Sequence, residues 1–211
     1  MRRPQTAGEE IANSLSHGLG LVGALVSAPV LILTTLESGR AINVIGAAVF
    51  AVTMVLLYCA STVYHAVPHK RAKAFLRKVD HGAIFLLIAG TYTPFALGDL
   101  NGPWGWTLFS IVWTIAAVGV TLKSLDRITN PATSLALYLV MSWVCVIAIG
   151  PLFDRVPQTG LALLAAGGFA YMAGVAFFVA DSRVRYGHFI WHLFVIAGTA
   201  CHFCAVLGYA A

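Results

Sequence analysis

The sequence predicts an all-α fold: a polytopic membrane protein built as a bundle of seven transmembrane helices. Of its 211 residues, 59% are hydrophobic and only 10% are charged, whereas soluble domains carry about 25% charged residues. The mean hydropathy is +0.85. The apolar stretches are continuous and long, unlike the alternating segments of ~10 residues that are typical of outer-membrane strands. We therefore expect helices that cross a bilayer.

Seven apolar stretches have about the length that a membrane-crossing helix needs. A helix rises ~1.5 Å per residue, so ~20 residues cross ~30 Å of hydrocarbon. In chain order, the expected spans are residues 15–36, 42–64, 81–97, 104–122, 132–152, 161–180 and 188–209. Because these spans use most of residues 1–211, we expect a single membrane domain with short loops. Any active site then lies within the bundle or at its mouths.

Polar segments separate the spans. Residues 69–78 are basic and amphipathic, which suits either a helix along the cytoplasmic interface or a solvated loop. Residues 97–103 combine Gly, Asp, Asn and Pro, which are typical of a turn. Trp104 and Trp106 follow this turn, where the fourth span begins, as expected for aromatic side chains at a membrane interface.

The distribution of basic residues predicts how the bundle is oriented. If the N-terminus is cytoplasmic and the spans alternate, 11 of the 13 Lys and Arg residues fall on the cytoplasmic side, and only Arg40 and Arg155 fall outside. The positive-inside rule therefore favours a cytoplasmic N-terminus and an outside C-terminus. This topology accounts for the net charge of +5 without nucleic acid as a partner. We expect membrane lipids as substrate or ligand.

Ionisable side chains are costly in lipid, so those at span ends are the first candidates for function. Ser61 and His65 end the second span and share one helix face, because they are four residues apart. His188 and His192 form a second such pair at the start of the seventh span. Asp80 opens the third span. The predicted topology brings all five to the cytoplasmic side at a similar depth.

This set of residues predicts a metal centre. Three imidazoles and one water form the ligand set of a catalytic zinc site, and His65, His188 and His192 could supply the imidazoles. Asp80 would then hold the water or a ligand imidazole, and Ser61 could hydrogen-bond near the same place. A single histidine could instead reach toward interfacial water. A pair four residues apart with a third at matching depth favours a metal ion, Zn²⁺.

The remaining histidines have other predicted roles. His202 lies ten residues beyond His192, or roughly 15 Å along the helix, so we expect it to be a hydrogen-bonded packing residue. His17 stands at the start of the first span and could line the entrance, where Asn13 or Ser14 would cap the helix. Surface or supporting positions are expected for His69 and His81.

Cysteine usage predicts neither disulfides nor a second metal site. All four cysteines fall inside apolar spans, where they behave as small hydrophobic side chains. Cys201 and Cys204 have the spacing of a metal-binding pair. No second pair accompanies them, so we expect them to pack in the last span.

The order of the polar motifs resembles the hemolysin III family, the bacterial branch of the progestin and adipoQ receptor group, which is similar to alkaline ceramidases. The motifs are Glu9-Glu10-Ile-Ala-Asn13 with Ser16-His17, Ser61-x-x-x-His65, Asp80-His-Gly, and His188-x-x-x-His192 followed by His202. The resemblance covers nearly the whole chain. It implies a seven-helix bundle with zinc near the cytoplasmic face, bound by His65, His188 and His192, with Ser61 and Asp80 around the zinc-bound water.

Several functions fit these residues. The leading hypothesis is a zinc-dependent hydrolase of lipid amides or esters, such as ceramide-like lipids or phospholipids. A non-catalytic sensor or receptor of membrane homeostasis with a structural zinc is an alternative, as are a transporter with a proton relay and a pore-forming cytolysin. A water-filled pore needs polar stripes along whole spans, whereas the polar residues here collect at one end. We expect a multi-pass protein of a bacterial inner (plasma) membrane.

Overall fold

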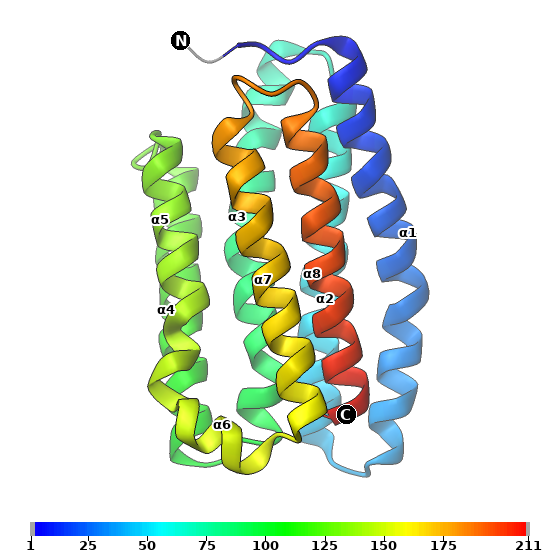
Figure 1. Cartoon of the computed structure of the whole chain (residues 1–211), viewed down its shortest axis with the longest axis vertical. Coiled ribbons are helices and arrows are strands. Elements are labelled where there is room, and N and C mark those ends of the chain that lie inside the picture. Colours follow the sequence, from blue (N-terminus) through cyan, green and yellow to red (C-terminus); the bar gives the residue numbers. More distant parts are fainter. Residues whose placement is uncertain (1–2, 210–211) are drawn as a thin grey trace.

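The computed structural model describes residues 3–209, and every regular element in that range is helical. Long helices run side by side along the bundle (Figure 1). In chain order the elements are α1 (Ala7–Glu37), α2 (Ala41–Ala66), α3 (Lys70–Leu97), α4 (Pro103–Ser124), α5 (Pro131–Ser142), the 3₁₀ helix η1 (Trp143–Ala148), α6 (Ile149–Arg155), α7 (Gln158–Ala180) and α8 (Gly187–Tyr209). The predicted all-α fold is confirmed.

Six helical segments within residues 3–209 are long and apolar enough to cross a membrane. They are α1, α2, α4, the continuous stretch Pro131–Arg155, α7 and α8. The remaining long helix, α3, contains the expected span 81–97 and runs along the bundle with the others (Figure 1). It is less hydrophobic because basic residues occupy its first turns and Thr91, Tyr92 and Thr93 lie in its second half. The structure therefore supports six of the seven expected spans directly.

Two helices begin earlier than the sequence predicts. Thr6 caps α1: its hydroxyl accepts from the Glu9 backbone N–H at 3.3 Å, and the Glu9 carboxylate accepts from the Thr6 backbone N–H at 2.8 Å. This reciprocal capping box satisfies two N–H groups that would otherwise lack partners. The predicted cap at Asn13 or Ser14 is wrong, since both lie inside the helix.

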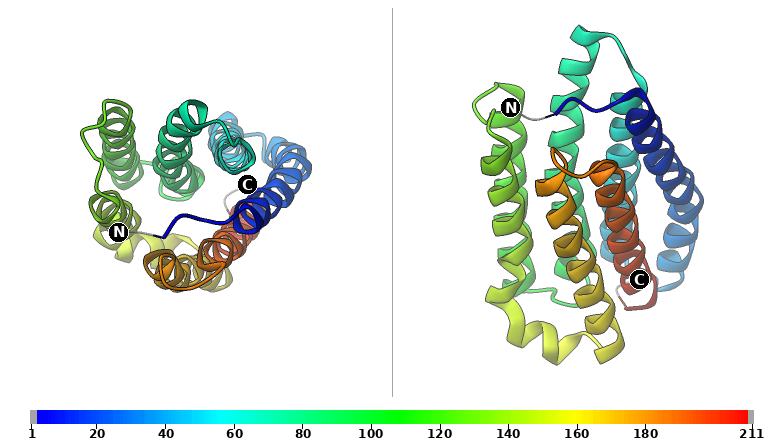
Figure 2. Two further views of the ribbon diagram at one scale, coloured as in Figure 1. Left: turned by 90° about the horizontal axis from the view of Figure 1, so that it is seen from above. Right: turned by 45° about the horizontal axis from the view of Figure 1, so that its top comes forward.

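The basic segment 69–78 is neither a loop nor a separate interfacial helix. His69 caps α3 by accepting from the Ala72 backbone N–H at 3.4 Å, so the basic residues form the first turns of that helix. These turns extend beyond the ends of the neighbouring helices (Figure 2). Lys70, Arg71 and Arg77 are exposed there, whereas Lys73 and Lys78 are partly buried.

The expected span 132–152 is not one regular helix. It passes from α5 through the 3₁₀ turns of η1 into α6, which bends under the bundle toward α7 (Figure 1). Pro151 lies in α6 and has no N–H with which to bond the carbonyl four residues earlier, so a regular α-helix cannot continue unbroken through this position. The break leaves α5 as a short helix at the side of the bundle.

The core lies between α1, α2, α3 and α8. Its largest fully buried apolar side chains include Leu31, Phe50 and Met54. A smaller cluster around Phe85 and Val112 joins α3 to α4 and α5. Large apolar residues remain exposed on the outer faces, as expected for a surface that meets lipid. The interior between the two ends is therefore filled with packed side chains.

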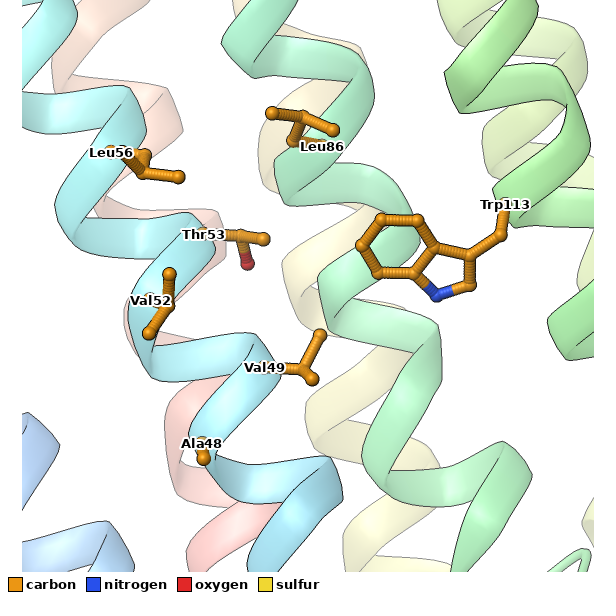
Figure 3. A pocket seen from close by; sticks show the side chains of 7 residues that line it. All are labelled: Ala48, Val49, Val52, Thr53, Leu56, Leu86 and Trp113. Carbon is orange, nitrogen blue, oxygen red and sulfur yellow. The ribbon is translucent and has the colours of Figure 1, made fainter.

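A groove opens on the outside where α2, α3 and α4 meet (Figure 3). Its lining residues are Ala48, Val49, Val52, Thr53, Leu56, Leu86 and Trp113. Almost all of this lining is carbon, which is what a surface against lipid tails requires. The groove contains none of the predicted site residues, so we assign no polar site to it.

One end of the bundle collects the predicted site residues. The C-terminal end of α2 and the N-terminal ends of α1, α3 and α8 lie there together (Figures 1 and 2). The basic first turns of α3 and the basic segment between α7 and α8 are at this same end, while Arg40 and Arg155 lie at the opposite one. The shared end that the topology predicts is therefore present.

Candidate metal centre

Three histidines from two helices meet at this end of the bundle. One ligand atom from each of His65, His188 and His192 lies within 4.8 Å of the other two. The ring centroid of His65 is 5.2 Å from that of His188 and 5.1 Å from that of His192. The centroids of His188 and His192 are 4.7 Å apart. A single ion between these rings could contact all three imidazoles.

The tight turn before α8 helps to position His188 and His192. His188 and His192 occupy successive turns on one face of α8. The turn before α8 is tight: Tyr186 has a φ of 58°, and a Cβ on Gly187 would lie 3.1 Å from the Cα of Asp181. Gly187 therefore lets the first turn of α8 pack closely against the end of α7.

Hydrogen bonds hold the rings of His65 and His192. Nδ1 of His65 lies 2.7 Å from Oε2 of Glu10. Nδ1 of His192 lies 3.2 Å from the backbone oxygen of Asn13 and 3.1 Å from the Ser16 hydroxyl. A carboxylate and a carbonyl oxygen only accept, so Nδ1 carries the proton in both neutral rings. Nε2 is then left as the ligand atom of each ring.

The other nitrogens agree with this assignment. His65 Nε2 is buried and has no hydrogen-bond partner among the described residues. Nδ1 of His188 faces Oδ2 of Asp181 at 3.8 Å, and Asp181 in turn accepts from Nε2 of Gln5 at 3.2 Å. An orphaned buried nitrogen directed into a cluster of imidazoles is the arrangement that a bound metal ion would satisfy.

Asp80 and Ser61 adjoin the cluster without belonging to it. Ser61 hydrogen-bonds the Asp80 carboxyl group, and His65 is close enough to interact with that group electrostatically. Both Asp80 and Ser61 are buried. The buried cation Lys123, whose Nζ donates to Ser134 Oγ at 3.0 Å, contributes a positive charge near Asp80. A carboxyl group therefore stands next to a candidate metal ligand.

The N-terminal segment passes over this end of the bundle (Figure 2). The buried Glu9 carboxylate accepts from the Arg3 guanidinium at 2.8 Å and from the Tyr186 backbone N–H at 3.0 Å. This pairing raises the pKa of the Arg3 guanidinium, so Arg3 stays charged. Glu9 thus ties the residues before α1 to the α7–α8 turn, next to His188.

Nearly the whole chain is similar to known proteins. The profile of the family described as haemolysin-III related matches residues 5–203. The chain belongs to the haemolysin-III related family. It is 40% identical to Hemolysin-3 of Bacillus cereus over 208 residues, which cover 99% of this chain and 94% of that protein.

Two further proteins are similar to this chain over nearly its whole length. The Hemolysin-3 homolog of Bacillus subtilis (strain 168) is 40% identical over 204 residues, covering 97% of this chain and 95% of that protein. The human Monocyte to macrophage differentiation factor is 30% identical over 219 residues, covering 99% of this chain and 87% of that protein. The predicted family and its link to the progestin and adipoQ receptor group are confirmed. The likeness to alkaline ceramidases stays a prediction.

The bacterial relatives and the membrane-crossing helices also confirm the predicted location. This haemolysin-III related protein is a multi-span protein of a bacterial plasma membrane.

One histidine of this haemolysin-III related chain lies where the sequence did not predict it. His17 is buried, with its ring stacked on that of His192 at a centroid distance of 3.5 Å. The edge of Tyr58 packs against it. His17 is therefore behind the cluster and not at the entrance. Glu10, Asn13 and His17 recur at a spacing of three and four residues, which was the available signal for one helix face turned toward the site.

The other histidines and the cysteines behave largely as predicted. Nε2 of His202 is 3.2 Å from the Leu164 backbone oxygen, and the side chain is buried, which confirms a packing role. His69 is exposed at the start of α3. The backbone oxygen of His81 accepts from the Tyr138 hydroxyl at 2.7 Å. All four cysteines are free thiols; Cys59 and Cys204 are exposed, and Cys145 and Cys201 are partly buried.

Proposed function

We propose that this protein is a zinc-dependent intramembrane hydrolase of lipid amides or esters, with His65, His188 and His192 as the zinc ligands. The observation that carries the proposal is the convergence of three imidazoles, with ligand atoms within 4.8 Å of one another. Neutral imidazole nitrogens suit Zn²⁺, and three protein ligands leave the fourth position open for water or substrate. The buried, unpartnered Nε2 of His65 supports a bound ion at this point.

The residues around the cluster support a hydrolytic role. A bound zinc ion supplies Lewis acidity and a nucleophilic water at neutral pH. Asp80, buried beside His65, accepts the proton of the attacking water and passes it to the leaving group. Ser61 orients the Asp80 carboxylate through its hydrogen bond. Lys123 places a positive charge near that carboxylate.

We also propose that α3 is the seventh span and that the end with the site is cytoplasmic, which puts the N-terminus inside and the C-terminus outside. The basic residues gathered at this end support the orientation through the positive-inside rule. A site just within the cytoplasmic interface suits a lipid whose acyl chains stay in the bilayer while its scissile bond reaches the cluster. Ceramide-like lipids and phospholipids are the candidate substrates.

The alternative is a non-catalytic sensor of membrane homeostasis in which zinc only joins α2 to α8. In a structural site a protein side chain closes the fourth position, whereas a catalytic site leaves it open. The cluster brings together three imidazoles. Three protein ligands are the number that a catalytic zinc site uses, which favours an enzyme.

A pore-forming cytolysin is less well supported, although two relatives carry the name Hemolysin-3. The bundle interior is packed with residues such as Leu31, Phe50 and Met54, and a conducting pore would need a polar path past them. Hydrolysis of membrane lipids would weaken a target or host membrane without any pore.

The first test is the metal content of the purified protein, measured by elemental analysis. We expect about one zinc per chain in the wild type and little in His65→Ala, His188→Ala or His192→Ala, because each change removes one of three ligands. His202→Ala is the matched control, since His202 lies on α8 away from the cluster. Wild-type protein without zinc, or alanine variants that retain zinc, would rule out the proposed metal site.

The second test is turnover. Wild-type protein in lipid nanodiscs is incubated with ceramide or phospholipid labelled in the acyl chain, and release of fatty acid is measured before and after removal of zinc. Zinc-dependent release supports the hydrolase. A zinc-loaded protein that releases no fatty acid from either lipid favours the sensor.

A further inference from the structure

We infer that Glu10 is a positioning residue that holds His65 in its ligating orientation, and that Lys73 holds Glu10 in turn. This inference rests on the proposed zinc site, but it concerns residues that are not ligands. It makes α1, which supplies no ligand, part of the metal centre.

The contact between Glu10 and His65 joins α1 to the last turn of α2. Oε2 of Glu10 lies 2.7 Å from Nδ1 of His65. The His65 side chain is only 2% exposed and that of Glu10 is 24% exposed, so the hydrogen bond is largely shielded from water. A carboxylate at Nδ1 fixes the tautomer, turns Nε2 toward the cluster and makes the imidazole a better donor to a metal.

Lys73 completes the arrangement from α3. Its Nζ lies 3.0 Å from the same Oε2 of Glu10 and donates to the backbone oxygen of Tyr64 at 3.1 Å. It also lies 4.8 Å from the centre of the Tyr64 ring. Lys73 therefore pins the Glu10 carboxylate against the end of α2 and balances its negative charge. Three helices meet in this one chain of contacts.

The other two candidate ligands are held differently. Nδ1 of His192 contacts a backbone oxygen and a hydroxyl, and Asp181 stands 3.8 Å from Nδ1 of His188. Glu10 supplies a carboxylate that lies within hydrogen-bond distance of an imidazole of the cluster. Losing such an outer partner commonly weakens metal binding by ~10- to 100-fold, so Glu10 should matter more than its neighbours on α1.

The test is the zinc affinity of the full-length protein in detergent, measured by competition with a chromogenic chelator. We expect Glu10→Ala to bind zinc ~10- to 100-fold more weakly than the wild type. Glu10→Gln should fall between them, because its amide oxygen still accepts from Nδ1–H but lacks the charge. Lys73→Gln should weaken zinc binding by a smaller factor, since it acts only through Glu10.

The structure offers matched controls for both positions. Glu37→Gln changes a carboxylate at the far end of α1. Lys78→Gln changes a lysine of α3 whose Nζ pairs with Asp126 outside the cluster. Both control variants should bind zinc as the wild type does. The absorption spectrum of the Co²⁺-loaded protein should change in the Glu10 variants and not in the controls, because it reports the geometry around the metal.

Each outcome decides the inference. Weaker zinc binding in the Glu10 variants, with an unchanged melting temperature of the metal-free protein, supports it. Weaker binding that only follows a lower metal-free melting temperature assigns Glu10 to the fold and overturns it, as does wild-type affinity in both Glu10 variants. If neither Glu10 variant folds, the zinc affinity of Lys73→Gln decides the inference. A zinc affinity of Lys73→Gln equal to that of Lys78→Gln overturns the inference. A wild-type protein that binds no zinc overturns the proposed function as well.

Discussion

The imidazole of His17 stacks on that of His192, with ring centroids 3.5 Å apart and planes inclined by only 9°. Both nitrogens of His17 are buried and lack hydrogen-bond partners among the described residues. His17 therefore packs against the face of the His192 imidazole, which is a candidate zinc ligand. It does not itself bind the ion that would lie in the plane of the His192 ring. This contact joins α1 to α8 behind the cluster.

The stack predicts that the shape of His17 matters more than its nitrogens. We expect His17→Ala to lower the free energy of unfolding by about 2–4 kcal/mol, because it leaves a cavity beside His192. His17→Phe should be as stable as the wild type, since it keeps an aromatic ring and removes two unpaired polar atoms. Denaturant titration in micelles measures both. A His17→Phe variant that folds but loses zinc would identify His17 as a ligand and contradict the prediction.

Asp80 should separate catalysis from metal binding. Asp80→Asn keeps the size of the side chain and the neighbouring Ser61 contact, so we expect it to retain zinc. Turnover should fall by about 10²- to 10⁴-fold, because the amide cannot accept the proton of the attacking water. Zinc content and fatty-acid release are measured on the same preparation. Undiminished turnover would remove Asp80 from the proposed mechanism.

Close helix packing predicts opposite effects at two glycines. A Cβ on Gly46 would lie 2.9 Å from the Cα of Pro94, so Gly46→Ala must push α2 away from α3. We expect it to destabilise the bundle by about 1–3 kcal/mol. A Cβ on Gly23 of α1 would meet no neighbouring atom within 4 Å, so Gly23→Ala should be neutral or slightly stabilising. Equal melting temperatures of the two variants would contradict this account.

Asp99, in the turn after α3, predicts a pH dependence at the far end of the bundle. Burial raises the pKa of its carboxyl group from 3.8 to about 6, against the opposing effect of Arg40. The folded protein thus binds this proton more tightly than the unfolded chain. The stabilisation is complete below the unfolded pKa and is lost as the pH rises through about 6.

The isosteric variant Asp99→Asn should remove this contribution, because its amide does not ionise. Between about pH 4 and pH 6.5, the melting temperature of the wild type should fall relative to that of Asp99→Asn. Thermal unfolding of both proteins in the same detergent measures the difference. Parallel pH profiles would show that the folded and unfolded states bind the Asp99 proton equally.

The class of protein and the candidate ligands could be predicted from the sequence by itself. Apolar span length is a local property of the chain, and so is the four-residue spacing that pairs His188 with His192. Alternation of the spans then brought His65 and Asp80 to the same end. The break at Pro151 also had a local cause in the sequence, although the expected span ran through it.

The role of α1 was decided only by the tertiary structure. Glu10 contacts His65, which is 55 residues away, and Ser16 contacts His192, which is 176 residues away. No local pattern specifies such pairs, because they depend on how far each helix is shifted along and rotated against its neighbour. From the sequence, helix capping could explain Glu9 and Glu10, and the positive-inside rule could explain Lys73. In the folded protein, helix packing brings the same residues next to the imidazoles. A neighbouring helix can then supply the hydrogen-bond partner that a buried nitrogen needs.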